Sequence, residues 1–545
     1  MRVAIVDGYN DEPGGLGVPP YVDVYPRLIA GSIWLVDKTA RVDYITVDQF
    51  RRNEDLLARR MHGYDIVVFI AGVVVPGKYI GGTPARPVEL ARWARSIEGP
   101  LKILVGPAAR WGMGFEGGKP AYPPRYFTDS GFDILVRGDL EEYFYDLARH
   151  GPEKANPYRL RRDYRLYEEA ARLGSRIVRQ HPRLGWGLIA EIETYRGCAR
   201  WVSGGCSFCV EPLRGRPIQR DPRDIVNEVE ALYRWGVRAF RLGRQADILV
   251  YGSEELAGAE WPKPNPEALR RIFHGIRTVS PGLEVLHIDN VNPGTIARHP
   301  EESLEALKII VEYHTDGDVA AMGVETADPR VAEANNLNTT PEEALYAIEL
   351  VNKIGQRRGP SGLPHLLPGI NFILGLPGET SETYRLNRLF LEELLRRNLL
   401  VRRVNIRRLL PLPSTRVSRM KHGIRGRREK HARSFVHWVR SFFDREMLRR
   451  IAPRGTLLRG LWVEECSGAG YCYARQTGSY PLTVMIPCRS LYRHEFLDRV
   501  VVTGVHSARS LEGLPVPVAP GSRRKVLAKA RELGIVRGGP WSRLC

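Results

Sequence analysis

Three cysteines in one glycine-flanked loop constrain this chain more than any other feature. Seven residues separate Cys198 from Cys206, two separate Cys206 from Cys209, and Gly197, Gly204 and Gly205 lie among them. No fourth cysteine is near this loop. Four thiolates would indicate a closed structural zinc site or a fully ligated iron-sulfur cluster. Three thiolates indicate a four-iron cluster with one iron open to a ligand that is not protein.

The segments around this loop predict a repeated β/α architecture. A strand-like stretch precedes the loop and an amphipathic stretch follows it, and five more strand-like segments recur downstream with helical segments between them. Six β/α units are too few to close an eight-fold barrel, so they predict a partial, open barrel with ligands at the carboxyl ends of its strands. The strand-like segments are residues 187–194, 239–243, 283–289, 319–325, 369–375 and 401–407, and the first helix is residues 222–233. Buried or disulfide-bonded cysteines are the alternative interpretation of the loop.

This combination resembles the radical S-adenosylmethionine (SAM) superfamily over about residues 186 to 420. The commonest family spacing has three residues between the first two cysteines, so the first interval is longer here. The resemblance implies that Cys198, Cys206 and Cys209 hold a 4Fe-4S cluster and that SAM binds the open iron. It also implies that an electron donor drives reductive cleavage of SAM to a 5′-deoxyadenosyl radical. Catalytic residues that contact the substrate stay unassigned.

The resemblance also implies positions that bind SAM at four places. The aromatic residue in the cysteine loop faces the adenine, the end of the second strand receives the amino group, the end of the fourth lies near the ribose, and the fifth contacts the adenine. The matching residues are Phe208; Gly243, Arg244 and Gln245; Glu325 and Thr326; and Ile373 with Gly375.

The 545 residues predict several domains. Residues 1–145 alternate strands and helices, which is typical of a doubly wound parallel sheet, and such a domain before a radical SAM barrel resembles a cobalamin-binding domain. The cobalt-ligating motif Asp-x-His-x-x-Gly is missing from it, as are the cysteines that methylthiotransferases use for a second cluster. Cobalamin is therefore an alternative cofactor without its usual histidine.

The rest of the chain divides into five predicted segments. Residues 146–185 are predicted as a linker with a helix near Tyr164, and residues 186–430 as the partial (β/α)6 radical SAM barrel. Residues 431–453 are predicted as a connecting helix, and residues 454–510 as a small β-barrel similar to the TRAM or oligonucleotide-binding type. Residues 511–545 resemble a helix-hairpin-helix, as in uncharacterised archaeal radical SAM proteins that carry this motif at the C-terminus.

The formal net charge of +19 and the sequence pI near 9.7 favour a polyanionic partner, with RNA as the leading candidate. An arginine-rich, heat-adapted surface is the alternative explanation. Arginines are concentrated after the last barrel strand, and a basic group begins the last predicted helix. The residues predicted to bind nucleic acid are Arg402, Arg403, Arg407, Arg408, Arg523, Arg524 and Lys525.

Apolar segments and cysteine usage predict a cytoplasmic protein with no membrane partner. No run of about 18 uncharged apolar residues occurs, and the chain runs from Met1 directly into a strand-like segment. Seven cysteines do not make a disulfide scaffold. The remaining four, Cys466, Cys472, Cys488 and Cys545, lack a C-x2-C pair, and an auxiliary metal centre, buried cysteines and a disulfide all stay open for them.

The sequence therefore predicts a radical SAM enzyme that modifies RNA, with methylation or methylthiolation of tRNA as the expected reaction. A cobalamin-dependent methylase of a small molecule is the first alternative. The second is a non-catalytic nucleic-acid-binding protein whose cluster is structural or senses redox state.

Overall fold

We analysed a computed structural model, which describes residues 1–12, 15–72, 74–75, 81–115, 119–424, 426–467, 470–487 and 491–516. The chain forms two compact units, and each is described by itself. The first unit comprises Met1–Leu283 and Arg408–Lys421, and the second comprises Glu284–Arg407 and His422–Cys545. No helix among the described residues is long and apolar enough to span a membrane.

The first unit begins with a five-stranded parallel sheet. Its strands lie in the order β11-β8-β6-β1-β5. From β1 the chain first adds β5 at one edge of the sheet, and it then adds β6, β8 and β11 on the other side of β1. This reversal is the topological switch of doubly wound sheets. The strands expected to alternate with helices before residue 145 are present as β1 (Arg2–Asp7), β5 (Arg41–Thr46), β6 (Ile66–Ile70), β8 (Leu101–Val105) and β11 (Ile134–Leu135).

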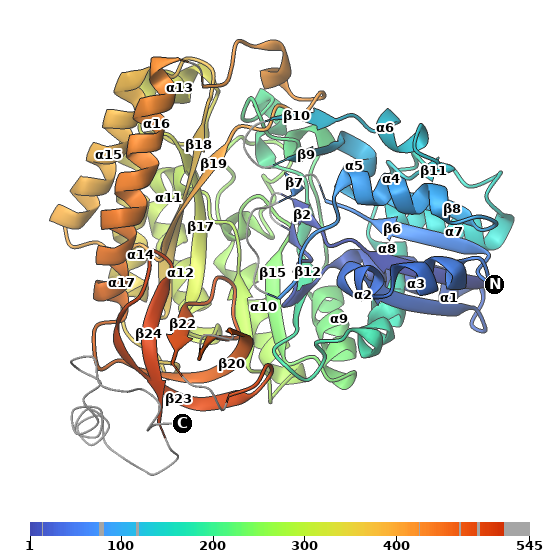
Figure 1. The fold of residues 1–545 in the computed structure, drawn as a ribbon. Helices are drawn as coiled ribbons and strands as arrows, with labels where there is room; N and C mark the ends of the chain where they lie inside the picture. The colour runs from blue at the N-terminus through green and yellow to red at the C-terminus, as the bar shows by residue number, and fades with distance from the viewer. Residues whose placement is uncertain are drawn as a thin grey trace. The chain divides into compact units, whose positions relative to one another are not determined.

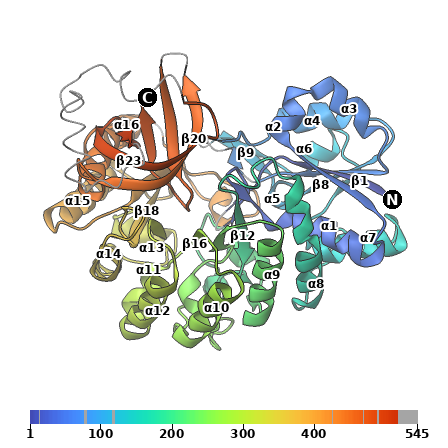
Figure 2. The same cartoon turned by 90° about the horizontal axis from the view of Figure 1, so that it is seen from below.

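Helices cover both faces of this sheet because its strands are apolar on both sides. Val3 and Ile5 of β1 belong to one core, and Ala4 and Val6 belong to the other. Figure 2 shows α1 and α7 on one face and α2, α3 and α4 on the opposite face. The helices are α1 (Val24–Val36), α2 (Val47–Arg52), α3 (Glu54–Met61), α4 (Pro87–Ser96), α5 (Pro107–Trp111), α6 (Arg125–Thr128) and α7 (Leu140–His150).

Residues 146–185 are not the linker that the sequence predicted. They contain α8 (Arg165–Gly174) and a 3-10 helix (Ser175–Gln180), and Tyr167 and Ile177 are buried in the same core as α1. At Gly31 of α1, a Cβ atom would lie 1.8 Å from the carbonyl oxygen of Ala170. The helix predicted near Tyr164 is present as α8, but the polar and basic composition of this segment did not show that one face of this helix is buried.

The cysteine loop follows strand β12 (Ile189–Glu193), which pairs in parallel with β15 (Ala239–Gly243). On its other side β12 pairs with β4 (Tyr21–Val22), a short N-terminal strand that the sequence did not reveal. The helices that follow β12 and β15 are α9 (Pro222–Arg234) and α10 (Pro266–Val279). Short strands complete the first unit: β2 (Asp11–Glu12), β3 (Gly15–Leu16), β7 (Val74–Val75), β9 (Met113–Phe115), β10 (Lys119–Tyr122), β13 (Tyr195–Arg196) and β14 (Ile218–Gln219).

The second unit contains the remaining four strands predicted for the β/α region. They are β16 (Val285–Ile288), β17 (Asp318–Glu325), β18 (Leu366–Leu374) and β19 (Arg403–Arg408), and β17, β18 and β19 are neighbours in one sheet. Figure 1 shows α15 and α16 running side by side beside these strands. The helices are α11 (Pro293–Arg298), α12 (Pro300–Tyr313), α13 (Pro329–Ala334), α14 (Pro341–Gly355), α15 (Ser381–Arg396), α16 (Arg427–Trp438) and α17 (Asp444–Ile451), with a π-helical turn (Val439–Phe443) before α17.

A closed five-stranded β-barrel ends the described chain, which confirms the small C-terminal barrel. Its strands lie in the order β20-β21-β22-β24-β23. They are β20 (Leu457–Ser467), β21 (Tyr471–Gln476), β22 (Thr483–Ile486), β23 (Phe496–Val505) and β24 (Ser510–Pro515). Residues 511–515, predicted to begin the helix-hairpin-helix tail, instead belong to β24, because their backbone pairs with β22 and β23. The tail after residue 516 lies outside the described residues.

Two of the four unassigned cysteines form a disulfide. Cys466 of β20 and Cys472 of β21 are directly opposite each other in the barrel and are bonded. These two sulfurs are therefore not open to a metal. Cys488 and Cys545 lie outside the described residues.

Candidate active site

The cysteine loop is closed at its base by a short antiparallel ladder. Tyr195 and Arg196 of β13 pair with Gln219 and Ile218 of β14, so the loop leaves and re-enters the fold at one place. Tyr195 is fully buried, and its hydroxyl donates to the carbonyl oxygen of Asp247 at 2.8 Å. The loop between these strands is thus held on a rigid support.

Two consecutive glycines turn the loop back toward the second cysteine. Gly204 and Gly205 have φ angles of 78° and 62°, in the left-handed region that favours glycine. A Cβ atom on Gly205 would lie 2.3 Å from Cγ of Pro212. The longer first interval of the loop is therefore compatible with the return of the chain to Cys206.

All three thiols of the loop are half-buried, and none forms a disulfide. Burial raises the pKa of the Cys198 thiol to about 12 and the pKa of Cys209 well above its usual value, and negative charge on Cys206 adds to both shifts. These thiols become thiolates only when a cation compensates their charge, as iron does. A sulfur-only set of three ligands fits an iron-sulfur cluster with one open iron.

No group of three or more His, Cys, Asp or Glu side chains in the described residues lies close enough to hold a single metal ion. A four-iron cluster is wider than one ion, so its three thiolates do not need to converge as ligands of one ion do. Among the described residues this finding speaks against a single-ion zinc site and is compatible with a cluster.

The residues between the first two cysteines place an arginine against the second sulfur. The guanidinium of Arg200 donates to Sγ of Cys206 at 3.3 Å and to the carboxylate of Glu260 at 2.9 Å. Arg200 also lies over the Trp261 ring, 5.4 Å from its centroid, and is 3 % exposed. Ser203 donates to the same Glu260 carboxylate at 2.7 Å. The longer interval therefore supplies a buried cation that contacts a candidate cluster ligand.

Phe208 lies between the second and third thiols and is half-buried. The amide of Cys209 donates to the carbonyl oxygen of Cys206 at 3.1 Å, which makes a tight turn around Phe208. The carbonyl oxygen of Ser207 accepts from the amide of Val417, so a segment distant in the sequence also supports the turn.

The end of β15 holds Gly243, Arg244 and Gln245, the predicted site for the SAM amino group. Arg244 has a φ of 61°, and its guanidinium pairs with Asp23 at 2.9 Å and with Glu193 at 3.2 Å. Gln245 is buried, and its side-chain amide donates to the carbonyl oxygen of Leu242 at 3.0 Å. Both long side chains are therefore engaged by the protein, which leaves the main chain of this turn as its candidate ligand-binding part.

Glu325 and Thr326 end strand β17 in the second unit. Glu325 has a φ of 63°, and its Oε2 atom is buried without a hydrogen-bond partner among the described residues. Burial raises its pKa to about 8, opposed only by Arg407. A strained backbone and an unsatisfied carboxylate oxygen are typical of a ligand contact, and ribose hydroxyls are donors that fit it. Thr326 contacts Asn387 instead, at 3.3 Å.

Ile373 and Gly375 lie at the end of β18, also in the second unit. The Ile373 side chain is half-exposed, whereas the flanking Phe372 and Leu374 are buried. Gly375 has a φ of 97°, its carbonyl oxygen accepts from Gly423 at 2.8 Å, and its amide donates to Glu379 at 2.8 Å. An apolar side chain beside a fixed turn is suited to one face of an aromatic ring.

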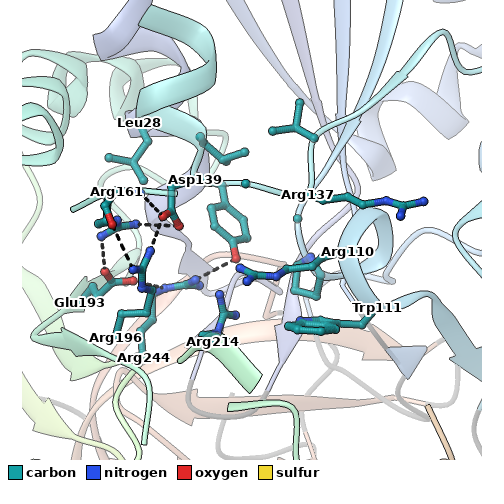
Figure 3. Close-up of a pocket in the computed structure, with 16 residues that line it drawn as sticks. Leu28, Arg110, Trp111, Arg137, Asp139, Arg161, Glu193, Arg196, Arg214 and Arg244 are labelled. Atoms are coloured by element: carbon teal, nitrogen blue, oxygen red, sulfur yellow. Dashed lines mark hydrogen bonds and ion pairs between the residues drawn. The ribbon is translucent and has the colours of Figure 1, made fainter. Parts of the chain in front are cut away.

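The first unit also contains a pocket that the sequence did not predict. It is lined by residues that follow β8 and β11 and by residues of the cysteine-bearing segment (Figure 3). Six arginines line it, against the carboxylates of Asp139 and Glu193. These arginines are scattered along the sequence, so only their position in the fold reveals them.

The arginines predicted to bind nucleic acid have different environments. Arg402 donates to the carbonyl oxygen of Tyr480, and burial together with Arg403 lowers its pKa to about 9. Arg403 lies over the Tyr480 ring, 3.5 Å from its centroid. Arg407 and Arg408 are exposed at the end of β19. Arg523, Arg524 and Lys525 lie outside the described residues.

Comparison with known proteins agrees with this site. Residues 192–389 match the model of the radical SAM superfamily. The chain is 44% identical over 515 residues to an uncharacterized protein of Methanocaldococcus jannaschii, covering 94% of this chain and 93% of that protein. It is 26% identical over 205 residues to a tRNA-2-methylthio-N(6)-dimethylallyladenosine synthase of Protochlamydia amoebophila, covering 36% of this chain and 39% of the synthase.

A solved structure shares the fold at low identity. The radical S-adenosylmethionine methyltransferase TsrM from Kitasatospora setae, solved with cobalamin and a 4Fe-4S cluster bound, aligns with a TM-score of 0.50 and 16% identity. The alignment covers 76% of each chain. Together with the cysteine loop and the strand-end turns, these comparisons show that the chain belongs to the radical SAM superfamily of enzymes, whose cofactors are a 4Fe-4S cluster and SAM.

Proposed function

We propose that this enzyme modifies tRNA, with Cys198, Cys206 and Cys209 holding the cluster and Glu325 contacting the ribose of SAM. When bound, the reduced cluster supplies the electron that cleaves SAM. The protein holds the thiolates, orients SAM at the strand-end turns and excludes water. The six β/α units would together form the partial barrel, and the C-terminal β-barrel would hold the RNA.

The observation that carries this proposal is the aromatic surface of the C-terminal barrel. Trp462 of β20 and Phe496 of β23 are opposite each other, with ring centroids 5.0 Å apart, and Phe496 is 52% exposed. Tyr492, four residues earlier, is 67% exposed, and Arg493 beside it is exposed. Small β-barrels bind single-stranded nucleic acid by stacking bases on such aromatic side chains beside basic residues.

The net charge of +19 and the partial similarity to a tRNA-modifying synthase support the same substrate. Methylation fits residues 1–145 better than methylthiolation does, because this segment has no cysteine for a second cluster. The TRAM-like or oligonucleotide-binding character of the barrel is part of this proposal.

The test is tRNA binding by aromatic variants of the barrel. We expect Phe496→Ala to weaken binding by roughly 5- to 100-fold, because stacking contributes about 1–3 kcal/mol per base. Phe442→Ala is a matched control, since Phe442 is 51% exposed but lies in the π-helical turn before α17. Equal binding by both variants would contradict the role of the barrel. Mass spectrometry of nucleosides from a deletion strain would identify the modified base.

A cobalamin-dependent methylase of a small molecule is the second candidate. The strand order of the N-terminal sheet and the similarity to TsrM, solved with cobalamin, favour it. No histidine occurs before His62, so any cobalamin here would lack a histidine ligand from the Asp-x-His-x-x-Gly motif. Absorption spectra of the protein with hydroxocobalamin, and its retention on bulk tRNA at rising salt, distinguish the two candidates.

A further inference from the structure

The arginine-lined pocket of the first unit lies where doubly wound sheets bind ligands. Gly106 and Pro107 follow β8, and residues 136–140 follow β11, so the pocket opens at the carboxyl ends of two neighbouring parallel strands. The volume that the centre of a water molecule can reach in it is about 30 Å³. One water molecule needs about 10–15 Å³ by the same measure. The pocket therefore has the position of a ligand site and room for one small group.

Four of its six arginines are neutralised within the protein. Each of the four pairs with at least one carboxylate, and several carboxylates serve two arginines. The pairs are Arg161 with Asp139, Glu141 and Glu193; Arg196 with Asp139; Arg214 with Glu12 and Glu211; and Arg244 with Glu12, Asp23 and Glu193. The dashed lines in Figure 3 mark part of this network.

Arg110 is not neutralised in this way. No carboxylate of the described residues pairs with it, and its guanidinium instead lies over the Trp111 ring, 4.8 Å from the centroid. Burial, reinforced by the charge of Arg214, lowers its pKa to about 10. Figure 3 shows Arg110 extending toward Arg214 and Arg244, whereas Arg137 extends away from them. Arg110 is therefore a cation beside other cations, without a paired carboxylate among the described residues.

A second donor in the pocket is also unsatisfied. Nε of Arg196 is buried without a hydrogen-bond partner among the described residues, and Arg196 is 6% exposed. Buried donors without partners are rare in folded proteins, and a bound group commonly supplies the missing acceptor. Among the described residues, Arg110 and Arg137 of this pocket have no carboxylate pair, and Nε of Arg137, Arg161 and Arg196 is buried without a hydrogen-bond partner.

We propose that this pocket binds a small phosphorylated molecule, with Arg110 as its principal contact and Arg196 as a second donor. Guanidinium groups bind phosphate oxygens through paired, charge-assisted hydrogen bonds, and several arginines around one cavity suit a group with more than one negative charge. The proposal does not depend on the identity of the enzyme's substrate, because its principal contact, Arg110, lies outside the cysteine loop and the C-terminal barrel.

The test measures the melting temperature and the heat of binding of the full chain with inorganic phosphate and with pyrophosphate. We expect both anions to raise the melting temperature of the wild-type protein, because a ligand that binds only the folded state stabilises it. Arg110→Met should weaken pyrophosphate binding by roughly 10- to 100-fold. Without anions, the same variant should melt at or above the wild-type temperature, because an uncompensated charge has been removed.

Two further variants keep the result interpretable. Arg110→Lys retains the charge but not the paired donors, so it should bind pyrophosphate more weakly than the wild type and more tightly than Arg110→Met. Arg137→Met is the matched control, because Arg137 also lines the pocket without a carboxylate pair among the described residues, but it extends away from Arg214 and Arg244 and its guanidinium lies over the Tyr158 ring at 5.8 Å. It should bind pyrophosphate like the wild type.

Three outcomes would overturn the proposal. The first is wild-type protein that binds neither phosphate nor pyrophosphate, and the second is unchanged binding by both Arg110 variants. The third is stabilisation by a different ligand. Acetate that stabilises the protein as strongly as phosphate would assign the pocket to a carboxylate ligand, and stabilisation by hydroxocobalamin alone would assign it to a corrin.

Discussion

Arg200 connects the longer cysteine loop to the properties of the cluster that the loop is proposed to hold. Its guanidinium contacts Sγ of Cys206 and is itself paired with Glu260. Hydrogen bonds to the ligating sulfurs and the net charge around a cluster set its reduction potential. The interval between the first two cysteines therefore does more than lengthen the loop, because it places Arg200, which is paired with Glu260, against Sγ of Cys206.

Variants of this pair should shift the midpoint potential in opposite directions. Arg200→Gln removes positive charge and should make the potential more negative, whereas Glu260→Gln leaves Arg200 uncompensated and should make it more positive. Redox titration followed by electron paramagnetic resonance measures both shifts, and iron content shows whether the cluster has assembled. Arg234→Gln, at an arginine that is 72% exposed, is the control. Shifts of the same sign would mean that the pair only holds the loop.

Glu325 should make the stability of the protein depend on pH. Its folded-state pKa of about 8 lies above the ordinary value of 4.5, so the folded protein keeps a proton that the unfolded chain releases. Its contribution to stability is therefore complete below about pH 4.5 and is lost as pH rises through about 8. We expect the melting temperature of Glu325→Gln, relative to the wild type, to rise between pH 5 and about pH 8. A constant difference across this range would contradict the buried, unpaired carboxyl.

At the scale of elements, the loop returns to the strand framework through two left-handed glycines. Gly204 has no atom within 4 Å of an added Cβ, whereas an added Cβ on Gly205 meets Pro212 at 2.3 Å. The two positions therefore share the backbone requirement but differ in the space around them. The 3-10 helix that starts at Glu211 contains this proline, so the turn and the helix pack together.

Alanine at these two positions separates backbone strain from packing. Gly204→Ala should lower the free energy of unfolding by about 1–2 kcal/mol, because alanine is strained in the left-handed conformation. Gly205→Ala should lower it by about 1–3 kcal/mol more, because the added Cβ overpacks against Pro212. Gly205→Ala should also lower the iron content after anaerobic reconstitution. Denaturant unfolding and iron analysis measure the two effects. Equal costs for both variants would contradict the contact between Gly205 and Pro212.

The whole molecule carries a net charge of +19, although much of its interior charge is paired. Buried pairs such as Arg27 with Glu228 do not reach a partner. Arginines such as Arg407 and Arg408 are exposed, and their charge contributes to the long-range attraction of a polyanion. The net charge therefore favours association with RNA without assigning a specific contact.

Binding of tRNA should consequently depend steeply on salt. If about eight phosphates are neutralised, affinity should fall by roughly three orders of magnitude between about 50 and 200 mM salt, because counter-ions are released on binding. Filter binding across this range measures the slope. A flat response would exclude an electrostatic RNA interface and would favour the small-molecule candidate.

The sequence by itself determined the local elements and pointed to the candidate cluster loop. Alternating and continuous apolar patterns located β1, β12 and β15, and the cysteine spacing indicated three ligands, because both signals are encoded within a few residues. The closed C-terminal barrel followed from short strands between turns in the same way.

Only the tertiary structure decided which distant residues meet. It buried α8 against α1, paired β4 with β12, and turned Arg244 toward Asp23 instead of leaving it open at the strand end. It also gathered the arginines of the arginine-lined pocket and, within the described part of the chain, placed Arg110 against the Trp111 ring and not against a carboxylate. Burial and ion pairing depend on neighbours far along the chain, so no local pattern of residues carries this information.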